Sequence, residues 1–189
     1  MSYKKELKPS NALYPTPVIL VTSVDESDKP NIITLAWAGN LCSVPPQVGI
    51  SVTPQRYSNG LIRKTKEFVV NIPTEDILKE TDYCGLVSGK TVDKFKETKL
   101  TPIKASKVKP PLIKECPVSL ECKVKNVINI GSHDLFIGET INIDADENVV
   151  GQRGNIDFVK LKAVTWNPIS LEYYSLGRRL GSIGFSKKK

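Results

Sequence analysis

The sequence has few of the side chains that bind metal ions. Its 189 residues include one histidine and four cysteines. The cysteines, at positions 42, 84, 116 and 122, lack the C-x-x-C spacing of zinc sites and redox dithiols. A single histidine does not complete a metal site with such scattered thiols. We therefore expect no metal ion, and we expect reduced thiols, as in other cytoplasmic proteins.

Long apolar runs are also missing. The longest strongly apolar stretches, such as Val18–Val21, are far shorter than the ~20 residues that a membrane-spanning helix needs. The N-terminal residues Met1–Glu6 lead into a stretch broken by prolines at positions 9, 15 and 17, not into the apolar centre of a signal peptide. The sequence therefore predicts a cytoplasmic protein without a membrane span.

The glycine motifs of common nucleotide-binding sites are absent as well. No G-x-G-x-x-G occurs, which argues against a Rossmann dinucleotide site. The segment Gly85–Thr91 resembles a P-loop, but three residues separate its two glycines where a P-loop has four. It also follows a predicted helix instead of a strand. We therefore expect no nucleoside triphosphate site.

What the sequence has in excess is positive charge, with a formal net charge of +7. All 20 acidic residues lie at or before Glu172, and 22 of the 27 basic residues lie in the same part of the chain. The other five basic residues follow Glu172. Most of the excess therefore lies in a C-terminal tail, and such charge runs are usually solvated. We expect one globular domain over residues 1–175, a basic tail over residues 176–189, and no nucleic-acid interface.

Short β-branched runs separated by glycine, proline, asparagine and aspartate indicate a mostly β fold with short helices. The predicted strands are Val18–Val24, Ile32–Trp37, Val48–Thr53, Phe68–Ile72, Val118–Ile130, Leu135–Ala145, Phe158–Val164 and Leu171–Leu176. One helix is predicted between Gln55 and Lys66, and another after Thr74, which can cap it. A long loop is predicted over Thr91–Pro111. This pattern favours a closed or nearly closed antiparallel barrel over a doubly wound sheet.

Two segments carry groups suited to a ligand. Gln55–Ser58 begins the first predicted helix directly after a strand, where free amides, the Arg56 guanidinium and the Ser58 hydroxyl suit a phosphate. The alternative is that Ser58 only caps the helix and Arg56 is a surface charge. In Thr34–Pro46, small residues let a flat ligand approach the backbone beside Trp37. The alternative is that Trp37 fills the core.

Two further side chains have reactive groups: His133, which lies outside these segments, and Cys42, which lies within one of them. His133, the one histidine, follows Gly131 at the predicted tip of a hairpin. There an imidazole can titrate near neutral pH or hydrogen-bond an anionic ligand, and the alternative is a loop residue without a chemical role. Cys42 lies in the segment of small residues, either as a packed thiol or against a ligand.

Five motifs in this order resemble the flavin reductase-like family, particularly its flavoredoxin branch, over about residues 11–146. The motifs are Ala36–Gly39 with Ser43–Pro46, Arg56–Ser58, Phe68–Pro73, Ser88–Phe95 and Gly131–Glu139. The resemblance implies a split β-barrel of antiparallel Greek-key type that binds FMN at a homodimer interface. The barrel predicted independently from the strand pattern agrees with it.

The resemblance also implies roles for single residues. Arg56 and Ser58 would hold the FMN phosphate, and Lys94 would add positive charge to it. Phe95 would form a wall on the nicotinamide side, and His133 would orient the reduced nicotinamide or protonate the flavin. Contacts to the isoalloxazine edge and the ribityl chain would come from Thr34, Leu35, Ala36, Trp37, Asn40, Leu41 and Cys42. No role is assigned to the residues after position 146.

The activity that the resemblance implies is hydride transfer from NADH or NADPH to FMN, with passage of the electrons to an acceptor protein or a partner monooxygenase. One alternative is an FMN-binding electron-transfer or carrier protein without NAD(P)H turnover. A more remote one is a basic barrel that binds nucleic acid. That barrel would need aromatic residues interleaved with lysine or arginine, and the sequence shows no such interleaving.

Overall fold

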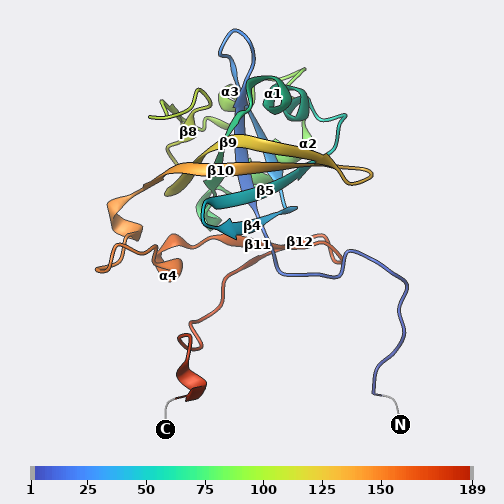
Figure 1. The fold of residues 1–189 in the computed structure, drawn as a ribbon, viewed down its shortest axis with the longest axis vertical. Helices are drawn as coiled ribbons and strands as arrows, with labels where there is room; N and C mark the ends of the chain where they lie inside the picture. The colour runs from blue at the N-terminus through green and yellow to red at the C-terminus, as the bar shows by residue number, and fades with distance from the viewer. Residues whose placement is uncertain (1–2, 188–189) are drawn as a thin grey trace.

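The computed structural model describes residues 3–187 and is built around one antiparallel sheet of seven strands (Figure 1). The order of the strands in the sheet is β3-β2-β6-β9-β10-β5-β4. Their bounds are Ile19–Val24 for β2, Pro30–Leu35 for β3, Ala38–Ser43 for β4, Pro46–Val52 for β5, Glu67–Ile72 for β6, Val118–Asn129 for β9 and Asp134–Ala145 for β10. The predicted mostly β fold is confirmed.

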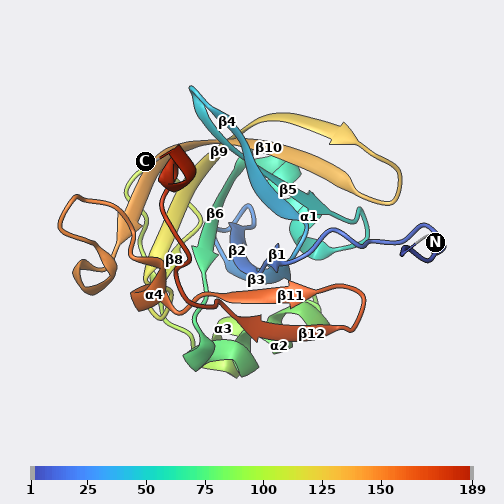
Figure 2. The same cartoon turned by 90° about the horizontal axis from the view of Figure 1, so that it is seen from below.

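The strand order forces this sheet to curl. β3 and β4 are its two edges, yet they follow one another in the chain and are joined by Ala36 and Trp37 alone. Such a link spans about 11 Å at most, so the two edges must lie close together. The sheet therefore closes into a nearly complete barrel, which Figure 2 shows from below. The predicted barrel is confirmed, and its seam lies at Ala36 and Trp37.

The interior of the barrel is filled by β-branched and aromatic side chains. Phe68 and Phe136 are fully buried there. Gly138 in β10 makes room for the first of them, because a Cβ at this position would lie 2.4 Å from the Phe68 ring. β2 is buried along its whole length, since a second core cluster that includes Leu20 covers its outer face. The barrel is therefore a packed and rigid support for its surface.

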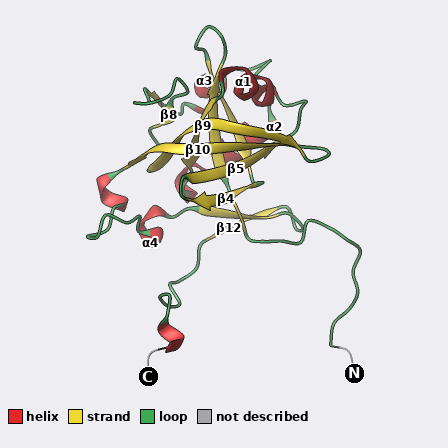
Figure 3. Ribbon diagram, in the orientation of Figure 1, coloured by secondary structure: helices red, strands yellow, loops and turns green. Residues whose placement is uncertain are grey.

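Short helices pack around the strands of the barrel (Figure 3). The two predicted helices are α1 (Tyr57–Thr65) and α2 (Leu78–Leu86). The predicted long loop also contains a helix, α3 (Lys94–Thr98), and the first strand of a small hairpin, β7 (Pro102–Ile103). α2 and α3 contribute Cys84 and Phe95 to the core cluster that covers β2 and β3. Other short elements are η1 (Glu75–Ile77), β8 (Leu112–Ile113), η2 (Glu147–Val149), α4 (Phe158–Leu161) and η3 (Phe185–Lys187).

The C-terminal region forms a second sheet of three strands, with β11 (Val164–Asn167) between β1 (Thr16–Pro17) and β12 (Glu172–Ser175). β12 confirms the last predicted strand. The strand predicted over Phe158–Val164 is wrong, because most of this segment forms α4. The Asp157 carboxylate starts that helix by accepting hydrogen bonds of 3.0 and 3.2 Å from the N–H groups of its second and third residues.

Both ends of the chain leave the body of the molecule. Residues 3–14 are exposed and run away from the barrel, as do the residues from about 177 onward (Figure 1). Arg178 and Arg179 of the predicted basic tail line a wide cavity beside α4. Lys188 and Lys189 lie outside the described residues, and the boundary predicted at residue 176 stays a prediction. Within residues 3–187, no helix is long and apolar enough to cross a membrane.

Candidate functional site

A cationic cavity of about 280 Å³ lies at the N-terminal end of α1. It brings together Arg56, Ser58 and Lys94, three residues predicted to bind phosphate. β3 forms one side of the cavity, and the chain that follows α2 forms the other. The residues that line it are Asn31, Ile33, Thr53, Gln55, Arg56, Tyr57, Ser58, Val87, Ser88, Gly89 and Lys94.

α1 begins at this cavity without the partners that usually complete a helix start. Arg56 is the N-cap residue, and its side chain makes no capping hydrogen bond. The first turn carries no acidic residue. The Ser58 hydroxyl, which is buried, accepts a hydrogen bond of 2.8 Å from the Asn31 amide, so its own proton is directed elsewhere. Free amides and the positive end of the helix dipole therefore face the cavity.

Lys94 is the most unusual side chain of the cavity, because it is a lysine with 4% of its surface exposed. Its Nζ donates hydrogen bonds of 2.7 Å to the Ile32 carbonyl and 2.6 Å to the Cys84 carbonyl. Burial lowers the pKa of Lys94 to about 8, an effect that the Cys84 thiol opposes and the Arg56 guanidinium reinforces. Among the described residues no carboxylate pairs with it.

The loop after α2 closes the cavity against β3. Gly89 packs against Asn31, and a Cβ at Gly89 would lie 1.8 Å from the Asn31 amide oxygen, so that only glycine fits here. The neighbouring Ser88 lines the cavity, and its hydroxyl accepts a long hydrogen bond of 3.3 Å from the N–H of Lys90. The loop therefore adds further hydroxyl and amide groups to a site that already holds two cations.

A second cavity, of about 210 Å³, follows the first along the same two elements. In β3, Asn31 and Ile33 line the cationic cavity, and Thr34 and Leu35 line the second one. On the other side, Val87–Gly89 line the cationic cavity, and Gly85 and Leu86 at the end of α2 line the second one. Residues 31 to 35 of an extended strand span roughly 13 Å. The two cavities therefore lie next to each other along β3, although they share no lining residue, and we call the pair the groove.

The floor of the second cavity comes from the C-terminal hairpin, to which the sequence assigned no role. Trp166 of β11 and Tyr173 of β12 pack with their ring centroids 4.6 Å apart, and both line the cavity. The Tyr173 hydroxyl donates a hydrogen bond of 2.9 Å to Asp82 of α2, which fixes the hairpin against the barrel. Burial and this carboxylate raise the pKa of Tyr173 above its ordinary value. The groove therefore has a cationic end and an aromatic end.

Of the residues predicted to contact a flavin ring, Thr34, Leu35 and Ala36 line the aromatic cavity. Trp37 lies at the seam of the barrel, where its carbonyl accepts a hydrogen bond of 2.8 Å from the N–H of Ser51. The other three, Asn40, Leu41 and Cys42, are exposed on β4, an edge strand that the sequence did not predict, and they line neither cavity.

Phe95 does not form a wall of the groove in this structure. Its side chain is 7% exposed and packs in the core cluster beneath β2 and β3, among Leu20, Ile32 and Cys84. The neighbouring Lys94 reaches the cavity because successive residues of α3 point in different directions. The structure therefore gives Phe95 a packing role, in which it holds α3 and with it Lys94.

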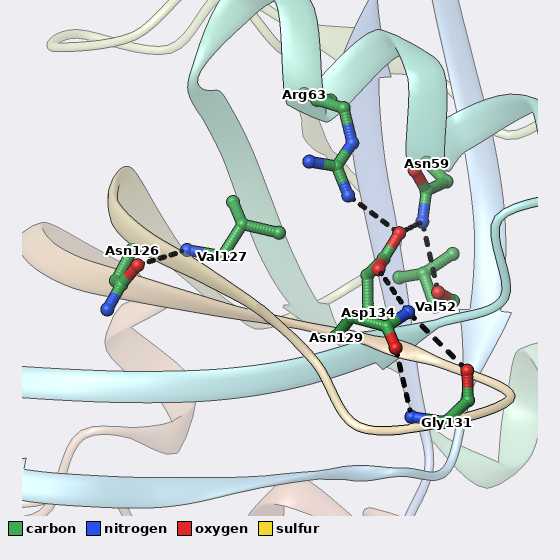
Figure 4. Close-up of polar contacts among 8 residues, drawn as sticks. All are labelled: Val52, Asn59, Arg63, Asn126, Val127, Asn129, Gly131 and Asp134. Atoms are coloured by element: carbon green, nitrogen blue, oxygen red, sulfur yellow. Dashed lines mark hydrogen bonds and ion pairs between the residues drawn. The ribbon is translucent and has the colours of Figure 1, made fainter.

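His133 lies in the turn between β9 and β10, outside the residues that line the two cavities. Its Nδ1 and the Ser132 hydroxyl share a hydrogen bond of 2.8 Å. The next residue, Asp134, is buried and fixes this turn to α1 (Figure 4). Its carboxylate accepts hydrogen bonds from Asn59 (2.9 Å), Asn129 (3.1 Å) and Arg63 (2.7 Å). These three donors hold the pKa of Asp134 below its usual range.

The groove has the chemistry of a site for an anion that carries a flat ring. Two cations, free helix amides and hydroxyl groups suit a phosphate at one end. Two aromatic rings in tilted contact and small residues suit a planar ring at the other end. In the described part of the chain, no group of three histidine, cysteine or acidic side chains is placed to hold a metal ion.

Comparisons with known proteins show similarity to flavin-related proteins. The family described as "Flavin reductase like domain" matches residues 11–170. The structure of the flavoredoxin of Desulfovibrio vulgaris (Miyazaki F) superimposes with a TM-score of 0.93 at 34% identity, covering 98% of this chain and 100% of that one. The flavoredoxin from Methanosarcina acetivorans gives a TM-score of 0.87 at 29% identity, covering 98% and 100%.

A curated relative of known activity is more distant. The reductase component of the 4-nitrophenol 4-monooxygenase/4-nitrocatechol 2-monooxygenase of Rhodococcus opacus is 24% identical over 128 residues. The match covers 68% of this chain and 65% of that protein.

Proposed function

We propose that this chain, which belongs to the flavin reductase-like family and resembles its flavoredoxin branch, is an FMN-binding oxidoreductase that takes electrons from NADH or NADPH and passes them to an acceptor. The groove between β3 and the end of α2 carries the proposal, because a cationic cavity and an aromatic cavity lie there next to each other along β3. FMN has a phosphate at one end and a planar ring at the other, and it needs both kinds of surface in this order.

The cationic cavity fits the phosphate of FMN. The Lys94 ammonium is buried against two carbonyls and has one donor left, so an anion would offset a charge that is costly to bury. The Arg56 guanidinium has no hydrogen-bond or ion-pair partner among the described residues, so it is free to bind the same group. Ser58 directs its hydroxyl proton away from Asn31. Together these groups would bind a phosphate dianion.

The aromatic cavity is suited to the ring end of the same ligand. Bound flavin would supply the chemistry of the reaction, since it accepts a hydride and releases electrons. The residues of this chain would hold and shield it. Thr34, Leu35 and Ala36 present a strand surface to one side of the ring, and Trp166 and Tyr173 exclude water from the other side.

His133 remains the candidate for orienting the nicotinamide or for moving a proton at the flavin. The Asp134 network supports this role, because three hydrogen bonds from α1 and β9 fix the residue next to the histidine. His133 lies outside the groove of its own chain. A role at the flavin would therefore require the hairpin turn to approach the groove of a second subunit, in a homodimer.

The edge of the barrel is consistent with such a homodimer. β4 pairs with β5 on one side and is exposed along most of its length. Leu41 of β4 and Val44 in the turn after it are 50% and 89% exposed. An uncovered edge strand with large apolar side chains is a common site of association. A dimer would also bring the predicted contacts Asn40 and Cys42 to a site that includes a second chain.

A second candidate function is that of an electron carrier that holds FMN without NAD(P)H turnover, which the resemblance to flavoredoxins favours. A partner monooxygenase is proposed as one acceptor because a distant relative is the reductase component of a two-component monooxygenase.

The test is to mix the FMN-loaded protein anaerobically with NADH and with NADPH and to follow the visible flavin absorbance. Bleaching within seconds supports the oxidoreductase. FMN binding without bleaching by either nucleotide would support the carrier. A protein that binds no FMN would contradict both functions.

A further inference from the structure

The C-terminal arm, residues 177–187, carries large apolar side chains that the rest of the described chain does not cover. Ile183 is fully exposed, and Leu180 and Phe185 are 87% and 67% exposed. The arm leaves the barrel after β12 (Figure 1). Three large apolar side chains within six residues form a concentration of exposed apolar surface that marks an interaction site.

The end of the arm is a compact turn and not an extended chain. Its backbone hydrogen bonds run from the Phe185 N–H to Ser182 and from the Lys187 N–H to Gly184, at 3.0 and 2.9 Å. Gly184 has a φ of +82°, a conformation that favours glycine. The Phe185 ring packs over Gly181, where a Cβ would lie 3.1 Å from it. The turn therefore presents its apolar side chains at the end of the arm that is remote from the barrel (Figure 1).

Positive charge surrounds these side chains, and no acidic residue follows Glu172 in the sequence. Arg178 and Arg179 precede Leu180, Lys187 ends the turn, and two more lysines follow in the sequence. None of the three described cations of the arm forms an ion pair within the part of the chain that the structure describes. Apolar and basic side chains on one acid-free segment are the combination that binds anionic lipid surfaces.

The start of the arm has the same character, because it lines a cavity of about 980 Å³ together with α4. Phe158 and Val159 of α4 are exposed there, so they extend the apolar surface of the arm. Lys162 adds a third cation to the two arginines. Of the two carboxylates that line the cavity, Asp157 caps α4, and Glu75 is the other. Positive charge therefore exceeds negative charge at both ends of the arm.

We propose that the C-terminal arm docks this protein on an anionic lipid surface. Ile183 and Phe185 enter the headgroup region, and Arg178, Arg179 and Lys187 bind lipid phosphates. A second copy of the chain is a poorer partner, because its body has nearly equal numbers of acidic and basic residues. Glycine and serine also separate the large side chains of the arm. Single side chains of this kind can enter a lipid surface without the matched shape that a protein interface needs. The proposal is independent of the proposed function.

The test is cosedimentation of the full-length protein with vesicles of equal parts phosphatidylglycerol and phosphatidylcholine, and with vesicles of phosphatidylcholine alone. Two double variants change the arm, Arg178→Gln with Arg179→Gln and Ile183→Ser with Phe185→Ser. All four side chains are exposed, so the barrel core stays intact. The matched control is Lys96→Gln with Lys104→Gln, which removes the same charge from two exposed lysines of α3 and of the chain after β7.

We expect binding to the anionic vesicles that weakens at high salt, and little binding to phosphatidylcholine alone. The arginine variant should bind about 30-fold more weakly, the apolar variant at least about tenfold more weakly, and the control within about twofold of the wild-type protein. FMN affinity, measured in parallel by fluorescence quenching, should be the same in all of them.

Three results would overturn the inference and leave the proposed function standing. One is no binding to the anionic vesicles, or an equal loss of binding in the control and the arm variants. Another is a lower molecular mass of the apolar variant in analytical ultracentrifugation, which would assign the arm to a second copy. The third is tight binding of a single-stranded oligonucleotide that only the arginine variant loses, which would assign the arm to nucleic acid.

Discussion

The affinity for FMN should fall steeply above pH 8 because Lys94 must carry a proton to bind the phosphate. Burial holds the pKa of this lysine at about 8 in the ligand-free protein, compared with 10.5 for an ordinary lysine. A phosphate dianion beside the ammonium favours the charged form and raises the pKa again. FMN binding is therefore coupled to proton uptake whenever the pH exceeds the pKa of the free protein.

The size of the effect follows from the two pKa values. If the phosphate offsets the whole effect of burial, the pKa returns to 10.5 in the complex. The dissociation constant then rises by nearly tenfold per pH unit between pH 8 and 10.5, and by about 30-fold in all between pH 7 and 9.5. The phosphate itself contributes no slope in this range, because its second pKa is about 6.

The assay is a fluorescence titration with FMN from pH 6.5 to 9.5, repeated with riboflavin and with the Lys94→Met variant. Riboflavin lacks the phosphate, so its affinity should not depend on Lys94. Lys94→Met should bind FMN more weakly at pH 7 and lose the steep slope. An equal slope for riboflavin, or a slope that persists in Lys94→Met, would refute the placement of the phosphate at Lys94.

The stability of the ligand-free protein gives an independent measure of the same group. The pKa of Lys94 is lower in the folded state than in the unfolded one, so the buried charge destabilises the fold below pH 8. This cost disappears as the pH rises from 8 to 10.5, so the contribution of Lys94 to the free energy of unfolding should rise by up to about 3 kcal/mol. Lys94→Met also leaves the Ile32 and Cys84 carbonyls without a donor, at about 1–3 kcal/mol each, which offsets its gain.

Three further predictions concern other residues. Arg56→Ala should weaken FMN binding by about tenfold, because it removes an unpaired guanidinium from the phosphate cavity; an unchanged dissociation constant would contradict the phosphate role. His133→Ala should slow the anaerobic bleaching of bound FMN by NADH or NADPH while FMN is retained, and an unaltered bleaching rate would leave His133 as a loop residue. Glu121→Gln should lower the free energy of unfolding by about 2–3 kcal/mol in urea titrations, because its buried carboxylate accepts the amides of Ser106, Lys107 and Val108. Burial of Glu121 favours the neutral acid, but these hydrogen bonds and those from the Asn142 and Ser106 side chains bring its pKa down to about 2. The stability that the carboxylate contributes is therefore present above about pH 4.5 and is lost as the pH falls toward 2. An equally stable Glu121→Gln protein would contradict this role.

The parts of the fold that followed from the sequence are those in which the local pattern and the tertiary structure agree. β2 and β6 are buried runs rich in β-branched residues, and β9 and β10 alternate apolar with polar residues over much of their length, so period and composition predicted them. β4 was missed because its residues, AGNLCS, are small or polar and mostly exposed on an edge. The segment Phe158–Val164 has an apolar composition typical of a strand, but the Asp157 cap makes it helical.

The cationic end of the candidate site was predictable from the sequence, and the aromatic end was not. Arg56 and Ser58 stand at a strand-to-helix junction, which any reader of the sequence can find. Trp166 and Tyr173 are more than 125 residues from Thr34 and Leu35, and the pairing of β11 with β1 brings them to the same cavity. No local pattern signals that contact. Lys94 is an intermediate case. Its motif suggested a role at the phosphate, but the burial that lowers its pKa depends on the packing of α3 against β3.

Two arginines of the same short segment show why pairing, and not residue type, separates structural from functional charges here. Arg63 forms a 2.7 Å ion pair with the buried carboxylate of Asp134, so its charge is balanced and it fixes the β9–β10 turn to α1. Arg56, two turns earlier, has no such partner and borders a cavity with a second unbalanced cation, Lys94. In the proposed function, a ligand anion is the partner of both. The net charge of +7 therefore matters to function at these few unpaired positions, since elsewhere in the body acidic and basic residues are nearly equal in number.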